Sequence, residues 1–101
     1  MSLKKQVLKS KPVCKVTFRL SKDEVKGAES VVLAGDFNNW DTTSSMKQLK
    51  TGDFTTLLEL EKGKSYEFRY LVDGEKWIND PEADRFATNE FGEENSVVEA
   101  I

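Results

Sequence analysis

Three aromatic residues stand apart from the others because they lie in or beside polar loops. Trp40 follows two asparagines in the phrase GDFNNWD, Trp77 comes two residues before an asparagine, and Phe91 lies among glutamates. A flat ring can stack on the apolar C–H face of a sugar while nearby amide and guanidinium groups hydrogen-bond its hydroxyls. The two tryptophans could instead close the ends of a small β-sandwich, and composition and spacing leave both alternatives open.

Other chemistry has weaker support. A glycosidase needs two carboxylates that flank the scissile bond, but aspartates such as Asp36 and Asp41 lie in turns, where this residue type normally caps backbone groups. Histidine, the commonest general base, is absent. Residues 80–84 (DPEAD) share the opening spacing of a calcium loop, yet the required glycine and distal glutamate do not follow in register. We therefore expect no catalysis, no metal and no other cofactor.

Charge and cysteine content narrow the class of partner. The net charge of −3 argues against nucleic-acid binding, because phosphate neutralisation needs a clustered positive surface. The longest apolar run is far below membrane-spanning length, and no secretory signal is found, so we expect a cytoplasmic protein without a membrane partner. The single cysteine, Cys14, excludes an intramolecular disulfide and is expected to be a small buried hydrophobe.

Strands are the elements that must position the three loop aromatics. Period-two alternation and short β-branched runs predict strands over residues 14–20, 30–34, 54–60, 65–72, 76–78 and 96–101. Turn-forming residues fill 35–45, and VDGE is a strong hairpin signal. Residues 1–11 are predicted to be a basic, solvated leader, and 12–101 a single domain. The pattern favours an all-β, immunoglobulin-like antiparallel sandwich of about six to eight strands.

Four motifs in this order resemble carbohydrate-binding module family 48. They are GDFNNW, YLVDG with Trp77 shortly after it, Asp80-Pro81, and Asn95 just before the last strand, and the likeness runs from about Lys15 to Ala100. The family contains the glycogen-binding domain of the AMP-activated protein kinase β subunit and the N-terminal domain of isoamylases and glycogen branching enzymes. The resemblance implies an early-set sandwich that binds α-1,4-linked glucan, such as glycogen or starch, without catalysis.

The resemblance also implies roles for individual residues. Trp40 and Trp77 correspond to the stacking platforms. Arg69 lies where the kinase-subunit domains have a lysine that bonds sugar hydroxyls, and Phe91 lies where they have a leucine that inserts against the glucan. Asn95 matches their hydroxyl-bonding asparagine.

Two departures from the family pattern change the charge or shape of this site. Arg69 keeps the positive charge of the lysine but presents a planar fork. Glu93 falls where a threonine assists binding, and Glu94 adds a further charge to the same loop.

The leading hypothesis is a glucan-binding module whose partner is an α-glucan such as glycogen or a maltooligosaccharide. The alternative is a protein-interaction module that docks through the same aromatic surface on a glycan-metabolising enzyme. Retention by glycogen distinguishes the two.

Overall fold

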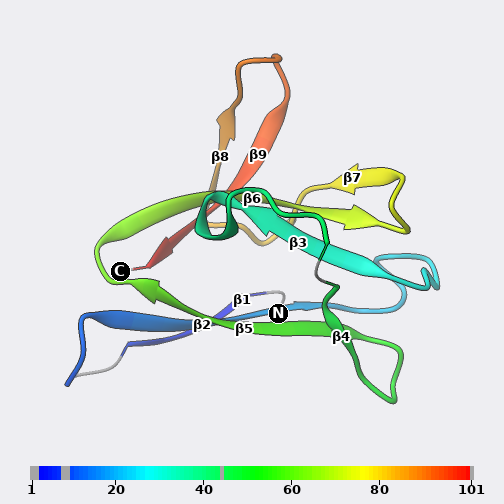
Figure 1. Cartoon of the computed structure of the whole chain (residues 1–101), viewed down its shortest axis with the longest axis horizontal. Coiled ribbons are helices and arrows are strands. Elements are labelled where there is room, and N and C mark those ends of the chain that lie inside the picture. Colours follow the sequence, from blue (N-terminus) through cyan, green and yellow to red (C-terminus); the bar gives the residue numbers. More distant parts are fainter. Residues whose placement is uncertain (1–2, 8–9, 44, 101) are drawn as a thin grey trace.

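The computed structural model describes residues 3–7, 10–43 and 45–100, and almost every regular element in these residues is a β-strand (Figure 1). The strands are β1 (Leu3–Val7), β2 (Val13–Leu20), β3 (Val31–Gly35), β4 (Lys47–Gln48), β5 (Phe54–Glu61), β6 (Lys64–Val72), β7 (Lys76–Ile78), β8 (Arg85–Thr88) and β9 (Glu94–Ala100). A short 3-10 turn, η1 (Asp36–Asn38), follows β3. The described part of the chain contains no helix with the length and hydropathy of a membrane span.

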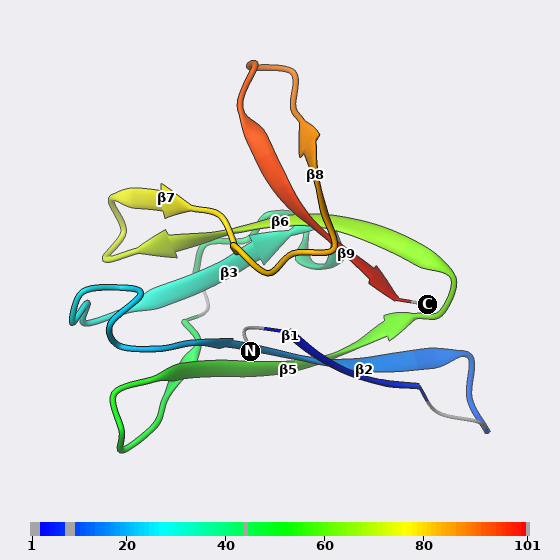
Figure 2. The same ribbon diagram turned by 180° about the vertical axis from the view of Figure 1, so that it is seen from behind.

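The strands form two layered antiparallel sheets. One has the order β1-β2-β5-β4, and the other has the order β3-β6-β9-β8 with β7 paired to the free end of β6. Figures 1 and 2 show the two sheets stacked, with the β8–β9 hairpin projecting away from both layers. The predicted all-β antiparallel sandwich is confirmed.

The core follows from the alternation of apolar residues along the inner strands. In β2 the side chains of Cys14, Val16 and Phe18 are buried, as the sequence predicts, and in β6 Phe68 and Tyr70 are buried. The rings of Phe18 and Phe68 meet edge to face at 5.2 Å across the two sheets. Burying one such side chain stabilises the fold by about 1.5–3 kcal/mol, so these strands supply a rigid base for the loops above them.

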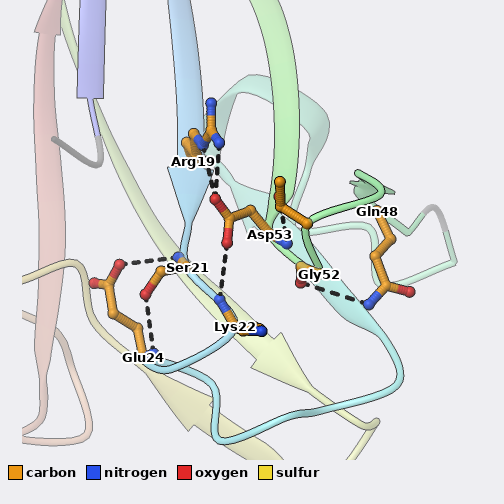
Figure 3. A network of polar contacts seen from close by, with 8 residues as sticks. Arg19, Ser21, Lys22, Glu24, Gln48, Gly52 and Asp53 are labelled. Atoms are coloured by element: carbon orange, nitrogen blue, oxygen red, sulfur yellow. Dashed lines mark hydrogen bonds and ion pairs between the residues drawn. The ribbon is translucent and has the colours of Figure 1, made fainter.

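A polar network fixes the turn that carries the chain out of β2 and toward the other sheet (Figure 3). The Asp53 carboxylate accepts hydrogen bonds from Arg19 Nη2 at 2.7 Å and from the Lys22 backbone N–H at 3.2 Å. These bonds, first of all the one from Arg19, lower the pKa of Asp53. Ser21 and Glu24 bond each other's backbone N–H reciprocally, which caps the turn.

Three strands were not predicted. The expected leader, residues 1–11, contains β1, which pairs antiparallel with β2 from Leu3 opposite Phe18 to Val7 opposite Cys14. This part of the prediction was wrong because only Leu3 of β1 is buried, so an edge strand of lysine and glutamine shows no alternation. The remaining leader positions 1, 2, 8 and 9 lie outside the described residues.

The other two missed strands have similar causes. Strand β8 is an edge strand with mostly exposed side chains, and β4 has only two residues, both exposed. Strand β9 begins at Glu94, two residues before the predicted start at Ser96, because it extends beyond the sandwich to pair with β8. Its predicted last residue, Ile101, lies outside the described residues.

Candidate functional site

The loop that follows β3 is held by the Asn38 side chain. Asn38 Oδ1 accepts the Gly35 N–H at 3.0 Å, and Asn38 Nδ2 donates to the Leu33 carbonyl at 3.0 Å. A backbone hydrogen bond closes the turn, in which the Trp40 N–H donates to the Gly35 carbonyl at 2.9 Å. The asparagine in GDFNNW therefore acts on the local backbone, and its hydrogen bonds place Trp40 at a fixed point beside β3.

Close packing against β6 explains the glycine and the phenylalanine of this motif. A Cβ atom on Gly35 would lie 2.5 Å from the Glu67 carbonyl oxygen and 2.7 Å from Phe68 Cβ. Only glycine lets the loop approach β6 this closely. The Phe37 ring points into the sandwich, 5.6 Å from the Phe18 ring, so it anchors the loop to the core.

Asp36 connects the Trp40 ring to the sheet. Its Oδ1 accepts the indole Nε1–H of Trp40 at 3.0 Å, and its Oδ2 accepts the Glu67 backbone N–H at 2.9 Å. Trp40 is half-buried and has φ 57°, a left-handed backbone conformation that bulky residues seldom adopt. Such a conformation costs roughly 1–2 kcal/mol. The bonds to Asp36 and Gly35 offset that cost and hold the indole in a defined orientation.

Trp77 and Arg69 lie together on the outer face of the second sheet. Trp77 pairs with Leu71 across β6 and β7, and Arg69 is two residues from Leu71 on the same face of β6. The Arg69 guanidinium carbon lies 5.7 Å from the centroid of the Trp77 ring, a cation–π distance. Trp77 is 37% exposed, so the ring contacts Arg69 and is open to solvent.

The Arg69 guanidinium has few polar partners among the described residues. Its Nη1 lies 4.0 Å from Glu93 Oε1, a long ion pair with an exposed carboxylate. Its Nε is buried and, within the described residues, has no hydrogen-bond partner. A buried donor left unpaired costs about 1–3 kcal/mol. Because Nε is buried, the Nη groups are the part of the guanidinium that can donate to a ligand in the pocket.

The loop of the β8–β9 hairpin is organised by Asn89. Its Oδ1 accepts the backbone N–H groups of Phe91 and Glu93 at 2.9 and 3.0 Å, and its own N–H donates to the Glu93 carbonyl at 2.7 Å. Gly92 adopts φ 78° in the same turn. Phe91, in the loop between β8 and β9, is 79% exposed.

Asn95 is the most buried of the five residues singled out in the sequence. It is 6% exposed. Its Nδ2 donates to Glu67 Oε1 at 3.1 Å, and its Oδ1 accepts from Asn89 Nδ2 at 3.3 Å. Each end of the amide therefore makes one hydrogen bond within the protein.

The turn after β7 has a structural network of its own. The buried Asp80 carboxylate accepts the Tyr70 hydroxyl at 2.8 Å and the Glu82 N–H at 2.9 Å. Burial, and then the Asp80 charge, raise the pKa of Tyr70 well above its ordinary value. Ser96 Oγ accepts the Asp80 N–H at 2.8 Å, which ties the turn to β9. Across residues 3–7, 10–43 and 45–100, no cluster of three or more acidic or thiol side chains could hold a metal ion.

One pocket of about 480 Å³ brings the five residues singled out in the sequence together. Its lining consists of Asp36, Trp40, Glu67, Arg69, Trp77, Asn89, Glu90, Phe91, Glu93 and Asn95. This volume lies within the usual range for small-ligand sites, and the lining combines aromatic surface with a few polar groups. Four carboxylates and one guanidinium belong to this lining, so the pocket disfavours an anionic ligand and offers several hydrogen-bond acceptors to hydroxyl groups.

Four lining residues were not predicted to belong to the site: Asp36, Glu67, Asn89 and Glu90. Glu67 could have been found, because it lies two residues before Arg69 in β6 and so projects from the same face of the sheet. Asp36 and Asn89 carry no such signal. Their positions depend on hydrogen bonds within loops.

Comparison with known protein families gives a match over most of the chain. Residues 15–101 match the family described as the glycogen recognition site of AMP-activated protein kinase. The matched range contains all of the residues that line the pocket. No match was found among curated proteins.

Proposed function

The chain belongs to the glycogen recognition family of AMP-activated protein kinase, and we propose that residues 12–101 form a non-catalytic module that binds α-1,4-linked glucan. The observation that carries this proposal is the shared pocket of Trp40, Trp77 and Arg69, which come from separate parts of the chain. Glycogen incubated with the purified chain is expected to release no reducing sugar.

We assign stacking to the two indoles and hydroxyl binding to the guanidinium. The bond from Trp40 to Asp36 leaves the indole N–H unavailable to ligand, so this residue contributes ring surface only. Trp77, which is 37% exposed, would offer a second ring, and Arg69 lies against this ring. Phe91 would contact the glucan from the projecting hairpin. A bound chain of glucose units would then lie against all of these side chains.

The affinity is expected to be modest. A stacked aromatic contributes on the order of 1 kcal/mol beyond area burial. A site with few such contacts should give dissociation constants between about 1 μM and 1 mM, or roughly −8 to −4 kcal/mol.

Affinity electrophoresis through a glycogen-containing gel tests the proposal. We expect the wild-type chain to be retarded and the Trp77→Ala variant to run faster. Phe86→Ala is a matched control, because Phe86 is an aromatic residue that is 44% exposed and does not line the pocket. If neither the wild-type chain nor Trp77→Ala runs more slowly in the gel with glycogen than in the gel without it, glucan binding is contradicted.

A protein-docking role is the second candidate, and the exposure of Phe91 favours it. A phenylalanine that is 79% exposed on a projecting hairpin is typical of an anchor that inserts into a partner. The partner class we propose is a glycan-metabolising enzyme. In this case Trp40→Ala should abolish capture of the enzyme, and glycogen should not retard the wild-type chain.

A further inference from the structure

The position of Asn95 raises the question of which polar group faces the ligand. With 6% of its surface exposed and its amide bonded to Glu67 and Asn89, Asn95 has little capacity to contact a sugar directly. An amide that gave up these bonds would leave buried groups unpaired, at a cost of about 1–3 kcal/mol. Asn95 lines the pocket but offers few hydrogen bonds to a ligand, so a second polar group on this side is of interest.

The Glu67 carboxylate occupies the suitable position. Glu67 lies on the outer face of β6, two residues before Arg69, and lines the pocket. Its Oε1 accepts from Asn95, while no partner for Oε2 is found among residues 3–7, 10–43 and 45–100. Its backbone N–H is held by Asp36, the residue that also holds the Trp40 ring. Glu67 is thus fixed at both its backbone and its side chain, with one carboxylate oxygen left over.

The chemistry of this oxygen matches a polyhydroxyl ligand. An ionised carboxylate is an acceptor only and offers several lone pairs. Sugar hydroxyls can donate to it, and hydrogen bonds to a charged acceptor are roughly twice as strong as neutral ones. Arg69, on the same strand face, offers donors beside it, so the two side chains present complementary groups to neighbouring hydroxyls.

We propose that Glu67 is an additional sugar-contacting residue and that Asn95 is a positioning residue, which acts by orienting the Glu67 carboxylate. This inference rests on the proposed glucan-binding function and names a further residue of the same site. It transfers the direct hydroxyl contact from Asn95 to Glu67.

An exchange of the carboxylate and amide groups between positions 67 and 95 tests the inference. In Glu67→Gln the amide oxygen can still accept from Asn95, but an NH₂ group replaces the acceptor that faces the ligand. In Asn95→Asp two carboxylates oppose each other, which displaces Glu67. The double variant Glu67→Gln/Asn95→Asp restores the hydrogen bond with its direction reversed, returns an acceptor oxygen to the ligand side, and keeps the bond from Asn89.

Isothermal titration with maltoheptaose should rank these variants, with thermal melts to show that each one is folded. We expect Glu67→Gln and Asn95→Asp each to weaken binding about fivefold to tenfold, the loss of one charge-assisted hydrogen bond. We expect the double variant to return to within about threefold of wild type. Glu67→Ala should bind at least as weakly as Glu67→Gln.

The outcomes separate this inference from the function on which it rests. Absence of binding by the wild-type chain overturns both. If the wild type binds and Glu67→Gln binds equally well, the role of Glu67 is refuted and glucan binding stands. If Asn95→Asp weakens binding and the double variant does not recover, Asn95 contacts the sugar itself and its assignment as a positioning residue is refuted.

Discussion

Removal of the Asp36 carboxylate should weaken glucan binding although Asp36 itself is not a stacking residue. The carboxylate joins the Trp40 indole to the Glu67 backbone through two hydrogen bonds of 3.0 and 2.9 Å. Asp36→Ala removes both bonds, whereas Asp36→Asn keeps one acceptor and turns a donor toward the other N–H. Without this connection the indole is free to rotate, and binding must order it again.

The size of the effect follows from the contact that is lost. An oriented aromatic platform contributes on the order of 1 kcal/mol, and 1.4 kcal/mol corresponds to a factor of ten in the dissociation constant. We therefore expect Asp36→Ala to weaken maltoheptaose binding by roughly fivefold, and Asp36→Asn to fall between this variant and wild type. Because Asp36 is exposed, the folded state should be affected less than the affinity.

Isothermal titration gives the affinity, and the indole N–H signal in a ¹⁵N–¹H NMR spectrum reports the bond directly. That signal should shift when Asp36 is replaced. Asp41→Ala is the matched control, since Asp41 lies in the same loop, bonds Thr43 and does not line the pocket. Unchanged affinity in Asp36→Ala together with an unshifted Trp40 signal would refute the reasoning.

Three further predictions concern packing, pH and ligand charge. Gly35→Ala should destabilise the fold by about 1–3 kcal/mol or more, because the new Cβ meets the Glu67 carbonyl and Phe68; a thermal melt with the midpoint unchanged would contradict this. Burial raises the pKa of Tyr70 in the folded state. The contribution of this shift to the free energy of unfolding is fully present below the unfolded pKa of ~10 and is lost as the pH rises above it. Absorbance at alkaline pH should show one tyrosine ionising only with unfolding, and Tyr70→Phe should remove that step. A phosphorylated maltooligosaccharide should bind more weakly than a neutral one at low salt, because four carboxylates line the pocket, and added salt should reduce the difference; tighter binding of the phosphorylated chain would exclude charge repulsion.

The sequence predicts the interior strands well because large apolar residues alternate there with polar ones. Phe18, Phe68 and Tyr70 are buried where that alternation places them. Edge strands show no such pattern, since the pairing of β1 and β8 depends on backbone hydrogen bonds and leaves most side chains in water. The alternation of apolar and polar residues alone therefore underestimates how far the sheets extend.

The site could be predicted only in part, for a different physical reason. Its aromatic residues are visible as large apolar side chains in polar loops. The orientation of Trp40 depends on an aspartate in the preceding turn, and the burial of Asn95 depends on a contact with Glu67, which is 28 positions away in the chain. Contacts between strands so far apart cannot be read from local spacing.

The central claim is that Trp40 and Trp77 form one glucan site. Titration of the wild-type chain with maltoheptaose, beside Trp40→Ala and Trp77→Ala with matched thermal melts, tests it most directly. We predict a dissociation constant between about 1 μM and 1 mM for the wild type, and a loss of roughly fivefold or more in each variant. Equal binding in all three folded proteins, or binding in none of them, would contradict the claim.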